Sequence, residues 1–469
     1  MRLTSLFLLP LTAVSALANV TLPSVLSSHM VLQRDMPVPV WGWAEAGEKV
    51  TVTFAGQTQE ATAGQDGKWS VKLAALPANA VPQSMTVKGK NEVILEDVLV
   101  GEVWIGSGQS NMQMDVGGSK DAPKEIAAAE FPKIRLFNVP LVSSPVPKDN
   151  LTASWEACSP KSVPKFSAVL YYMGRELHRE LNVPVGLIAD SWGGSRIEPW
   201  TPVEGFDLVP SQQENAKKIR ENGPKMEHGS GKLIGLYNAM IHPIVPYAIR
   251  GAVWYQGESN NGEGMLYLDR MKALVGGWRA VWKQGDFPFY HVQIAPYNYS
   301  RKGPEVDRNT TALAELWEAQ AESAKQIPHT GMAVINDVGE LNDIHPKNKQ
   351  EVGHRLALIA LAKDYGRKDL VYSGPVFTGH AVEGNRIRLK FDSVGGGLAS
   401  RDGKPLNWFE VAGADGKFVA ANASIDGKDV VVSAAGVTEP KAARFAFSQL
   451  AEPNLMNKEG LPAGAFRTK

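Results

Sequence analysis

The sequence predicts an α/β core with a β region on each side of it. Residues from about 20 to 100 alternate apolar and polar side chains with period two, as half-buried strands do. Between about 100 and 365, short apolar runs end in Gly/Ser/Asn-rich loops and precede helical stretches, the pattern of a parallel sheet with crossover helices. From about 371 onward, period-two runs and Asp-Gly turn dipeptides return.

Length and charge limit the possible functions. A chain of 469 residues predicts two to four domains at roughly 100–200 residues each. We expect a leader over 1–18, a β-sandwich over 19–100, an α/β domain over 101–368 and a β domain over 369–469. The 49 basic and 49 acidic residues cancel, so no strongly basic surface for nucleic acid is expected.

The N-terminus has the pattern of a secretory signal peptide. Arg2 precedes an apolar run that is too short to span a bilayer, and residues 16–18 (Ala-Leu-Ala) form a small-x-small cleavage site. We expect cleavage after Ala18 and a secreted or periplasmic protein without later membrane insertion. Cys158 is the only cysteine, so no intramolecular disulfide can form, which suits a bacterial periplasm.

The flanking β regions follow from local patterns. Residues 50–54 and 69–73 alternate on either side of an Asp-Gly turn, and residues 38–43 contain Pro39, which cannot donate to a ladder and predicts an edge strand. Alternation at residues 387–391 and three Asp-Gly dipeptides predict the second β domain.

The middle region carries both strand and helix signals. Its short apolar runs are residues 103–106, 185–189, 249–254 and 334–335. Helices are predicted over 313–326 and over 346–365, the second with Pro346 in its first turn. Ligands bind at the carboxyl ends of the strands in such sheets, so the loops after these runs are the candidate site.

Four loops near the predicted strand ends are rich in polar and small residues: 106–112, 190–196, 254–260 and 342–346. Because the carboxyl ends of parallel strands meet at one edge of a sheet, these loops are able to form a single site. Taken alone, the loop over 106–112 is equally well explained as a Gly/Ser-rich turn, and the loop over 190–196 is more often just a turn.

Individual residues of these loops suit acyl transfer. Ser110 lies in a tight strand-to-helix turn, beside backbone N–H groups that can bind an oxyanion, and Gly194 offers another such donor. Packing does not explain the polar cluster around Gln256. His345 is a candidate general base with Asp343 to orient it, although a lone His is more often a surface or core residue. No metal-ligand spacing or nucleotide-binding motif is found, so we expect neither metal nor cofactor.

Five motifs in order carry a resemblance to a known family. They are residues 30–34 with 40–43, then 108–112, 190–194, 256–260 and 343–346. With them the chain resembles the sialate O-acetylesterase family of the SGNH hydrolase superfamily over nearly the whole mature chain. Each motif alone is weak, whereas five in order are specific.

The resemblance implies a fold and a set of roles. It implies a flavodoxin-like three-layer α/β/α SGNH hydrolase domain, flanked by N- and C-terminal β-sandwich domains. Ser110 is then the nucleophile and His345 the base that activates it. The N–H groups of Ser110 and Gly194, with the side chain of Gln256, are then the oxyanion hole.

Two positions depart from the superfamily pattern. Gln256 stands where Asn is usual, and Asn342 stands three residues before His345, where Asp is usual. Asp343 lies two residues before the histidine instead. Both Asp343 and Glu258 therefore stay candidates for the group that orients His345.

The implied activity is a serine esterase reaction that removes O-acetyl groups from sugars through an acetyl-enzyme, without a cofactor. The candidate substrate contacts are Gln109, Asn111, Arg196, Trp200 and Glu258. Arg196 pairs either with the carboxylate of sialic acid or with an internal group such as Glu198. Three tryptophans suit the faces of neutral sugars: Trp192, Trp200 and Trp254.

Other functions stay open at this point. Exported relatives also act on acetylated plant polysaccharides such as xyloglucan, and a non-catalytic carbohydrate-binding protein is a further alternative. The lack of G-x-S-x-G argues against a lipase- or protease-like hydrolase. We expect an acetylated carbohydrate as partner and no nucleic acid; the sequence does not predict the oligomeric state.

Overall fold

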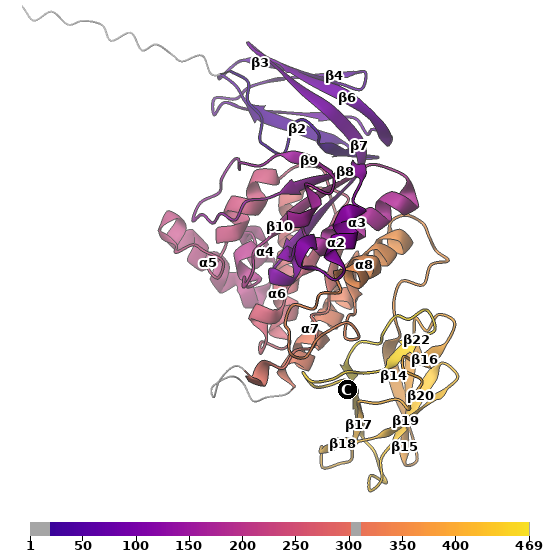
Figure 1. Ribbon diagram of the computed structural model, residues 1–469. Coiled ribbons are helices and arrows are strands. Elements are labelled where there is room, and N and C mark those ends of the chain that lie inside the picture. The colour runs from indigo at the N-terminus through magenta and orange to yellow at the C-terminus, as the bar shows by residue number, and fades with distance from the viewer. Residues whose placement is uncertain (1–18, 302–310, 469) are drawn as a thin grey trace, which may run out of the picture.

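The computed structural model describes residues 19–301 and 311–468, which fold around a central mixed sheet (Figure 1). The predicted leader, 1–18, lies outside the described residues. The central strands are β7 (Glu92–Gly108), β8 (Phe131–Asn138), β9 (Trp155–Cys158), β10 (Val185–Ser191), β11 (Gly251–Tyr255), β12 (Phe289–Val292) and β13 (Thr330–Ala333). Their order is β13-β12-β11-β7-β10-β8-β9, and all neighbours are parallel except β8 and β9.

The strand order places the first central strand in the interior of the sheet. Without β8 and β9, the strands run second, first, third, fourth and fifth in chain order, which is a doubly wound arrangement. The chain reverses its winding direction beside β7, and ligands bind outside the carboxyl ends of the strands at such a point. The predicted α/β core with additional β regions is confirmed.

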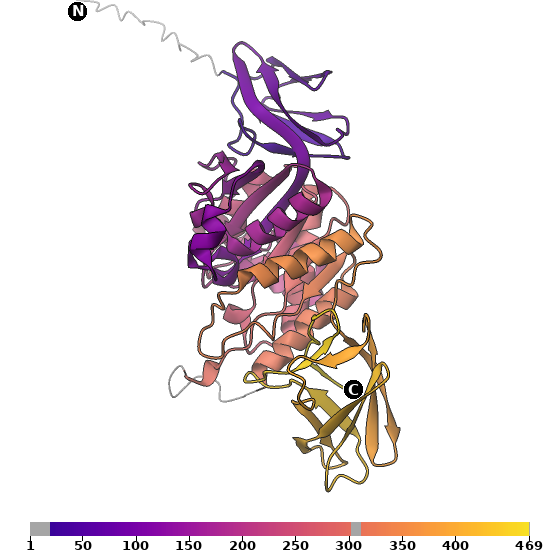
Figure 2. The ribbon, with the colours of Figure 1, turned by 45° about the vertical axis from the view of Figure 1, so that its right-hand side comes forward.

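Helices cover both faces of the sheet. The longer ones are α3 (Ala168–Leu181), α6 (Leu266–Trp282), α7 (Ala312–Gln326) and α8 (Lys349–Lys363). Successive side chains of β12 point to opposite faces: the Tyr290 hydroxyl donates to Asp364, just after α8, and His291 bonds to the carbonyl of Gln320 in α7. Helix α3 packs on α8, and α6 packs on α7, so two pairs of helices enclose the sheet (Figure 2).

The two long helices expected near the end of the core are present with one difference. The helix predicted over 313–326 is confirmed as α7. The second helix begins at Lys349 rather than at Pro346, because the Asn348 side chain accepts a hydrogen bond from the Glu351 N–H and caps the helix there. Pro346 therefore lies in the preceding loop. The shorter helices are α1 (Ser110–Gln113), α2 (Ala122–Ala127), α4 (Val203–Leu208) and α5 (Gln213–Asn222).

The N-terminal strands join the core through one long strand. They are β1 (Val31–Gln33), β2 (Val38–Trp43), β3 (Lys49–Phe54), β4 (Gln57–Thr62), β5 (Lys68–Leu73) and β6 (Asn79–Lys88). The first half of β7 pairs with β6, and its second half is the centre of the parallel sheet. The boundary expected at residue 100 thus falls inside a continuous strand. Of the named strands, β2 pairs only with β5, as expected of an edge strand, and its last residue, Trp43, also forms an isolated bridge with Thr21.

The C-terminal strands lie at the opposite end of the molecule (Figures 1 and 2). They are β14 (Val376–Glu383), β15 (Arg386–Asp392), β16 (Leu398–Ser400), β17 (Phe409–Ala412), β18 (Phe418–Ala420), β19 (Asn422–Asp426), β20 (Asp429–Ser433), β21 (Ala442–Phe445), β22 (Leu455–Asn457) and β23 (Phe466–Arg467). An ion pair of 2.8 Å between Arg467 and Glu318 fastens them to α7.

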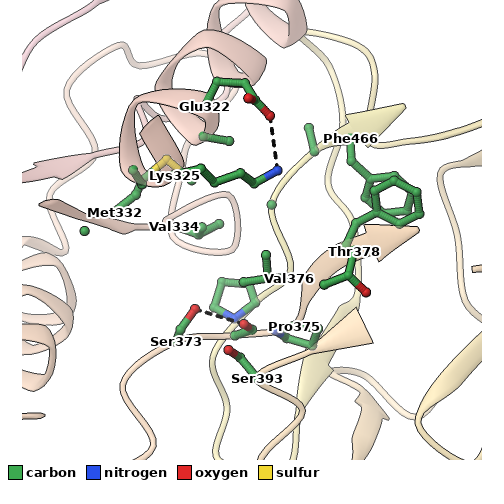
Figure 3. Close-up of a pocket in the computed structure, with 18 of the residues that line it drawn as sticks. Glu322, Lys325, Met332, Val334, Ser373, Pro375, Val376, Thr378, Ser393 and Phe466 are labelled. Atoms are coloured by element: carbon green, nitrogen blue, oxygen red, sulfur yellow. Dashed lines mark hydrogen bonds and ion pairs between the residues drawn. The ribbon is translucent and has the colours of Figure 1, made fainter. Parts of the chain in front are cut away.

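A cavity of about 490 Å³ lies between the core and these C-terminal strands. Lys325 of α7 lines one side and bonds to Glu322, while Thr378 and Phe466 line the other (Figure 3). Among the described residues, no helix has both the length and the apolar character needed to cross a bilayer.

Candidate active site

The site begins where β7 ends. Gly108, the last residue of β7, has φ +135°, and a Cβ atom there would lie 2.2 Å from the carbonyl oxygen of Tyr255 in β11. Only glycine allows this approach of two strand ends. The Gln109 N–H donates to the same Tyr255 carbonyl, and the chain turns at once into α1, whose first residue is Ser110.

Ser110 meets His345 at this strand end. The Ser110 Oγ and His345 Nε2 atoms lie 2.8 Å apart, although 235 residues separate them in the chain. Both residues are only partly buried, so a ligand can reach them. A serine hydroxyl in contact with an imidazole nitrogen is the arrangement in which the imidazole can accept the hydroxyl proton during nucleophilic attack.

Asp343 contacts the backbone of His345. Its Oδ1 accepts a hydrogen bond of 2.9 Å from the His345 N–H, which is the turn that an Asx side chain makes two residues ahead. The Asp343 N–H donates to Glu340 and closes the loop from the other side. This carboxylate therefore shapes the loop that carries the histidine.

Two backbone N–H groups in these loops make no hydrogen bond to the described residues. Within residues 19–301 and 311–468, neither the Ser110 N–H nor the Gly194 N–H donates to another protein atom. Gly194 is exposed, has φ +73° and borders open space. A Cβ atom on the adjacent Gly193 would lie 3.4 Å from Ser110 Cβ, so this turn lies against the serine. These two donors are suited to a developing oxyanion.

Gln256 lies behind the site in a buried network. Its Nε2 is within hydrogen-bonding distance of Gln109 Oε1, the Ser195 carbonyl and Asn260 Oδ1, at 3.1, 3.2 and 2.8 Å. Its Oε1 accepts from the Tyr267 hydroxyl at 2.8 Å. The two N–H bonds of the Gln256 amide therefore have three protein acceptors within reach, and the side chain is fully buried. In this conformation Gln256 joins the loops, and Gln109 belongs to the same network.

Asn111 and Glu258 form a second buried contact. Asn111 Nδ2 donates to Glu258 Oε1 at 2.5 Å and to the carbonyl of Ile344 at 2.9 Å. Burial raises the pKa of Glu258, while its hydrogen bonds and the charge of Lys349 act against that shift. These contacts connect the serine loop to the residue just before His345. Lys349 is a residue that the sequence reasoning missed.

Arg196 is paired inside the protein. Its guanidinium group bonds to the carboxylates of Glu198 and Glu263 and donates to the carbonyl of Ser259 at 2.9 Å. Arg270 bonds to the same two carboxylates. Although burial alone would raise the pKa of Glu198, the charge of Arg270 and the other contacts lower it overall. Of the two alternatives for Arg196, the internal pairing is the one that the structure shows.

The expectation that Trp200 contacts a sugar is corrected. Trp200 is 0% exposed and donates from Nε1 to Ser195 Oγ at 2.9 Å. Trp254, 1% exposed, packs edge-to-face against it with ring centroids 6.2 Å apart. Neither ring has a face for a ligand in this conformation. Trp192, next to the glycine turn, is only partly buried.

Among the residues that the structure describes, no three or more His, Cys, Asp or Glu side chains are grouped so that they could hold an ion.

Comparison with known proteins identifies the family. Residues 100–362 match the family model described as carbohydrate esterase, sialic acid-specific acetylesterase. The sialate O-acetylesterase of Rattus norvegicus is 32% identical over 412 residues, which cover 75% of this chain and 75% of the rat protein. The sialate O-acetylesterase of Homo sapiens is 32% identical over 388 residues, which cover 75% of this chain and 72% of the human protein. A crystal structure described as a novel carbohydrate acetylesterase from Xanthomonas citri has 37% identity and a TM-score of 0.87, covering 96% of this chain and 99% of that one. The chain therefore belongs to the sialic acid-specific acetylesterase family of carbohydrate esterases, and it is an ester hydrolase.

Proposed function

We propose that the chain removes O-acetyl groups from carbohydrates by a serine mechanism with an acetyl-enzyme intermediate. The observation that carries this proposal is the 2.8 Å contact between Ser110 Oγ and His345 Nε2. The N–H groups of Ser110 and Gly194 make no hydrogen bond to the described residues, and we assign them to the second requirement of acyl transfer, the binding of the oxyanion.

The reaction follows in two halves. Ser110 Oγ attacks the acetyl carbonyl while His345 Nε2 accepts the hydroxyl proton, and the Ser110 and Gly194 N–H groups bind the resulting oxyanion. Each such donor contributes roughly 3–4 kcal/mol in comparable sites. The bond from the acetyl carbon to the sugar oxygen then breaks, and His345 returns the proton to the leaving alcohol. Water attacks the acetyl-enzyme in the same way, which releases acetate and restores the serine.

The two candidate carboxylates act on His345 through the loop. Asp343 holds the backbone N–H of His345, and Glu258 holds Asn111, which in turn donates to the carbonyl of Ile344. Both contacts fix the position of the imidazole relative to Ser110. Gln256, whose N–H groups are engaged, positions the loops around the oxyanion site.

Ser110→Ala tests the mechanism. We expect it to abolish hydrolysis of p-nitrophenyl acetate and acetate release from acetylated glycans, with an unchanged melting temperature. Ser107→Ala, a buried serine three residues earlier, is the matched control and should keep wild-type activity. A Ser110→Ala enzyme with near wild-type kcat would exclude Ser110 as the nucleophile. A wild-type protein that binds glycans but releases no acetate would favour the carbohydrate-binding alternative.

We further propose that neutral acetylated oligosaccharides are better substrates than acetylated sialic acid. The internal pairing of Arg196 with Glu198 and Glu263 leaves this guanidinium neutralised rather than poised for a substrate carboxylate. The name of the Xanthomonas citri relative, a carbohydrate acetylesterase, is compatible with this substrate class. Acetate release should be compared among O-acetylated sialic acid, acetylated xyloglucan oligosaccharides and acetylated xylan. A kcat/KM at least tenfold higher for the sialic acid would contradict the proposal.

We also propose that the protein is exported, on the basis of the leader pattern over residues 1–18. Protein recovered from outside the cytoplasm of a bacterial host should then begin at Asn19. An N-terminus that still carries the leader would contradict this.

A further inference from the structure

Lys349 is a buried cation in an unfavourable place. It is the first residue of α8 and is 0% exposed. The N-terminus of a helix carries a partial positive charge, which disfavours a cation there. Removing an ammonium group from water adds a second cost. Lys349 is therefore destabilised both by the helix dipole and by desolvation, and we expect it to make contacts that offset both costs.

The contacts of Lys349 lead directly to the active site. Its Nζ donates to Asn111 Oδ1 at 2.5 Å and lies 5.1 Å from the centre of the Tyr255 ring, within the range of a cation–π contact. Asn111 follows Ser110 in the chain, and Tyr255 ends β11. The ammonium group thus bridges the serine loop and the strand end that positions it.

Lys349 also decides which way the Asn111 amide faces. An ammonium group only donates and a carboxylate only accepts, so the amide oxygen must face Lys349 and the amide nitrogen must face Glu258. In that orientation the nitrogen also reaches the carbonyl of Ile344. If the amide were reversed, its NH2 group would face the ammonium group of Lys349, donor against donor. Its oxygen would face the Glu258 carboxylate and the Ile344 carbonyl, acceptor against acceptor.

The charges around Lys349 fit a role inside the site. Burial lowers the pKa of Lys349 to about 7, and the carboxylates of Glu258, Asp343 and Glu340 oppose that shift. Two of these acids, Glu258 and Asp343, contact the loops that hold Ser110 and His345. In its protonated form the lysine is the local counter-charge of the acids that shape the active-site loops.

We propose that Lys349 is a positioning residue of the esterase: by donating to Asn111, it locks the amide that holds the His345 loop against the Ser110 loop. This inference rests on the proposed roles of Ser110 and His345. It adds a third element, the start of α8, to the two loops that those roles require.

The test compares Lys349→Met with Lys349→Gln. Methionine keeps most of the side-chain length without a donor, whereas glutamine keeps an N–H that can reach Asn111. Small displacements of catalytic groups cost about 10- to 100-fold in rate. We expect kcat for p-nitrophenyl acetate to fall at least tenfold in Lys349→Met with KM within threefold, and Lys349→Gln to recover at least half of the lost factor on a logarithmic scale. Lys347→Met, an exposed lysine two residues away, is the control and should match the wild type.

The outcomes separate this inference from the proposed function. Wild-type kcat in Lys349→Met, or a change in KM alone, would overturn the positioning role. Equal losses in both variants with a lowered melting temperature would make Lys349 a structural residue and would also overturn it. If Lys349→Met fails to fold, Lys349→Gln decides: retention of at least a third of the wild-type kcat supports the role, and a lower kcat overturns it. Ser110→Ala, assayed in parallel, tests the proposed function itself, since its loss of activity does not depend on Lys349.

Discussion

Gln113 Oε1 accepts a hydrogen bond of 2.7 Å from the Gly193 N–H. Gln113 ends the short helix that Ser110 begins, and Gly193 precedes the glycine whose N–H is the second candidate oxyanion donor. One side chain therefore sets the distance between the nucleophile and that donor. The next N–H along, that of Gly194, makes no hydrogen bond to the described residues.

Substitution of Gln113 should weaken the oxyanion site. Gln113→Ala removes the acceptor, so we expect kcat to fall about tenfold with little change in KM, because the lost interaction matters most in the transition state. Gln113→Glu keeps an acceptor oxygen and should retain most of the activity. Steady-state kinetics with p-nitrophenyl acetate distinguish the two variants. A glutamate variant as impaired as the alanine variant would argue against this role.

The activity should depend on the acceptor oxygen of Asp343 rather than on its negative charge. Since Asp343 Oδ1 accepts from the His345 N–H, Asp343→Asn keeps the acceptor and should lower kcat only a few fold. Asp343→Ala removes it, and kcat should fall about 10- to 100-fold as the loop shifts. If Asp343→Asn lost activity by about 10³-fold or more, the carboxylate would instead orient the imidazole ring by its charge.

Local sequence patterns predicted much of the fold. The prediction of α7 depends on helical periodicity, and the prediction of an edge strand around Pro39 depends on the N–H group that proline lacks. Both elements are present in the structure. The strand-end loops were expected to meet because parallel strands align their carboxyl ends, and the structure brings Ser110 and His345 together. Such features depend on neighbours in the chain or on the general geometry of a sheet.

Features that depend on tertiary contacts could not be predicted from local sequence patterns. Trp200 in a loop has the same local sequence whether its ring is exposed or, as here, packed on Trp254. Lys349 at a helix start is indistinguishable from a solvated lysine until its contact with Asn111 is known. The continuity of β7 across residue 100 was hidden because the composition changes there while the strand does not end.

Arg196 should act on stability rather than on substrate choice. Arg196→Met leaves the partly buried carboxylates of Glu198 and Glu263 with one fewer partner, although Arg270 remains. Because the Arg196 side chain is 36% exposed, we expect a loss of only about 1–2 kcal/mol in unfolding free energy. The ratio of kcat/KM for acetylated sialic acid and for neutral glycans should stay the same. A rise in KM confined to the sialic acid would show that Arg196 binds its carboxylate.

Asp190 should make the protein less stable as the pH rises. It is fully buried at the end of β10, neither of its oxygens has a hydrogen-bond partner among the described residues, and burial raises its pKa well above the usual range. The folded protein then keeps a proton that the unfolded chain releases above its ordinary pKa of about 4. Above that pH the unfolded state binds fewer protons, so the free energy of unfolding should fall by up to about 1.4 kcal/mol per pH unit until the folded-state pKa is reached.

Asp190→Asn tests this because the amide has nearly the same shape and does not ionise. Urea unfolding at pH 5.0 and 7.5 should show a smaller fall in stability for Asp190→Asn than for the wild type, and a higher stability at pH 7.5. Asp369→Asn, at an exposed position, should leave the wild-type dependence unchanged and serves as the control. The sign is decisive: a paired, ionised Asp190 would give stability that increases with pH, and the asparagine variant would then be less stable than the wild type at pH 7.5.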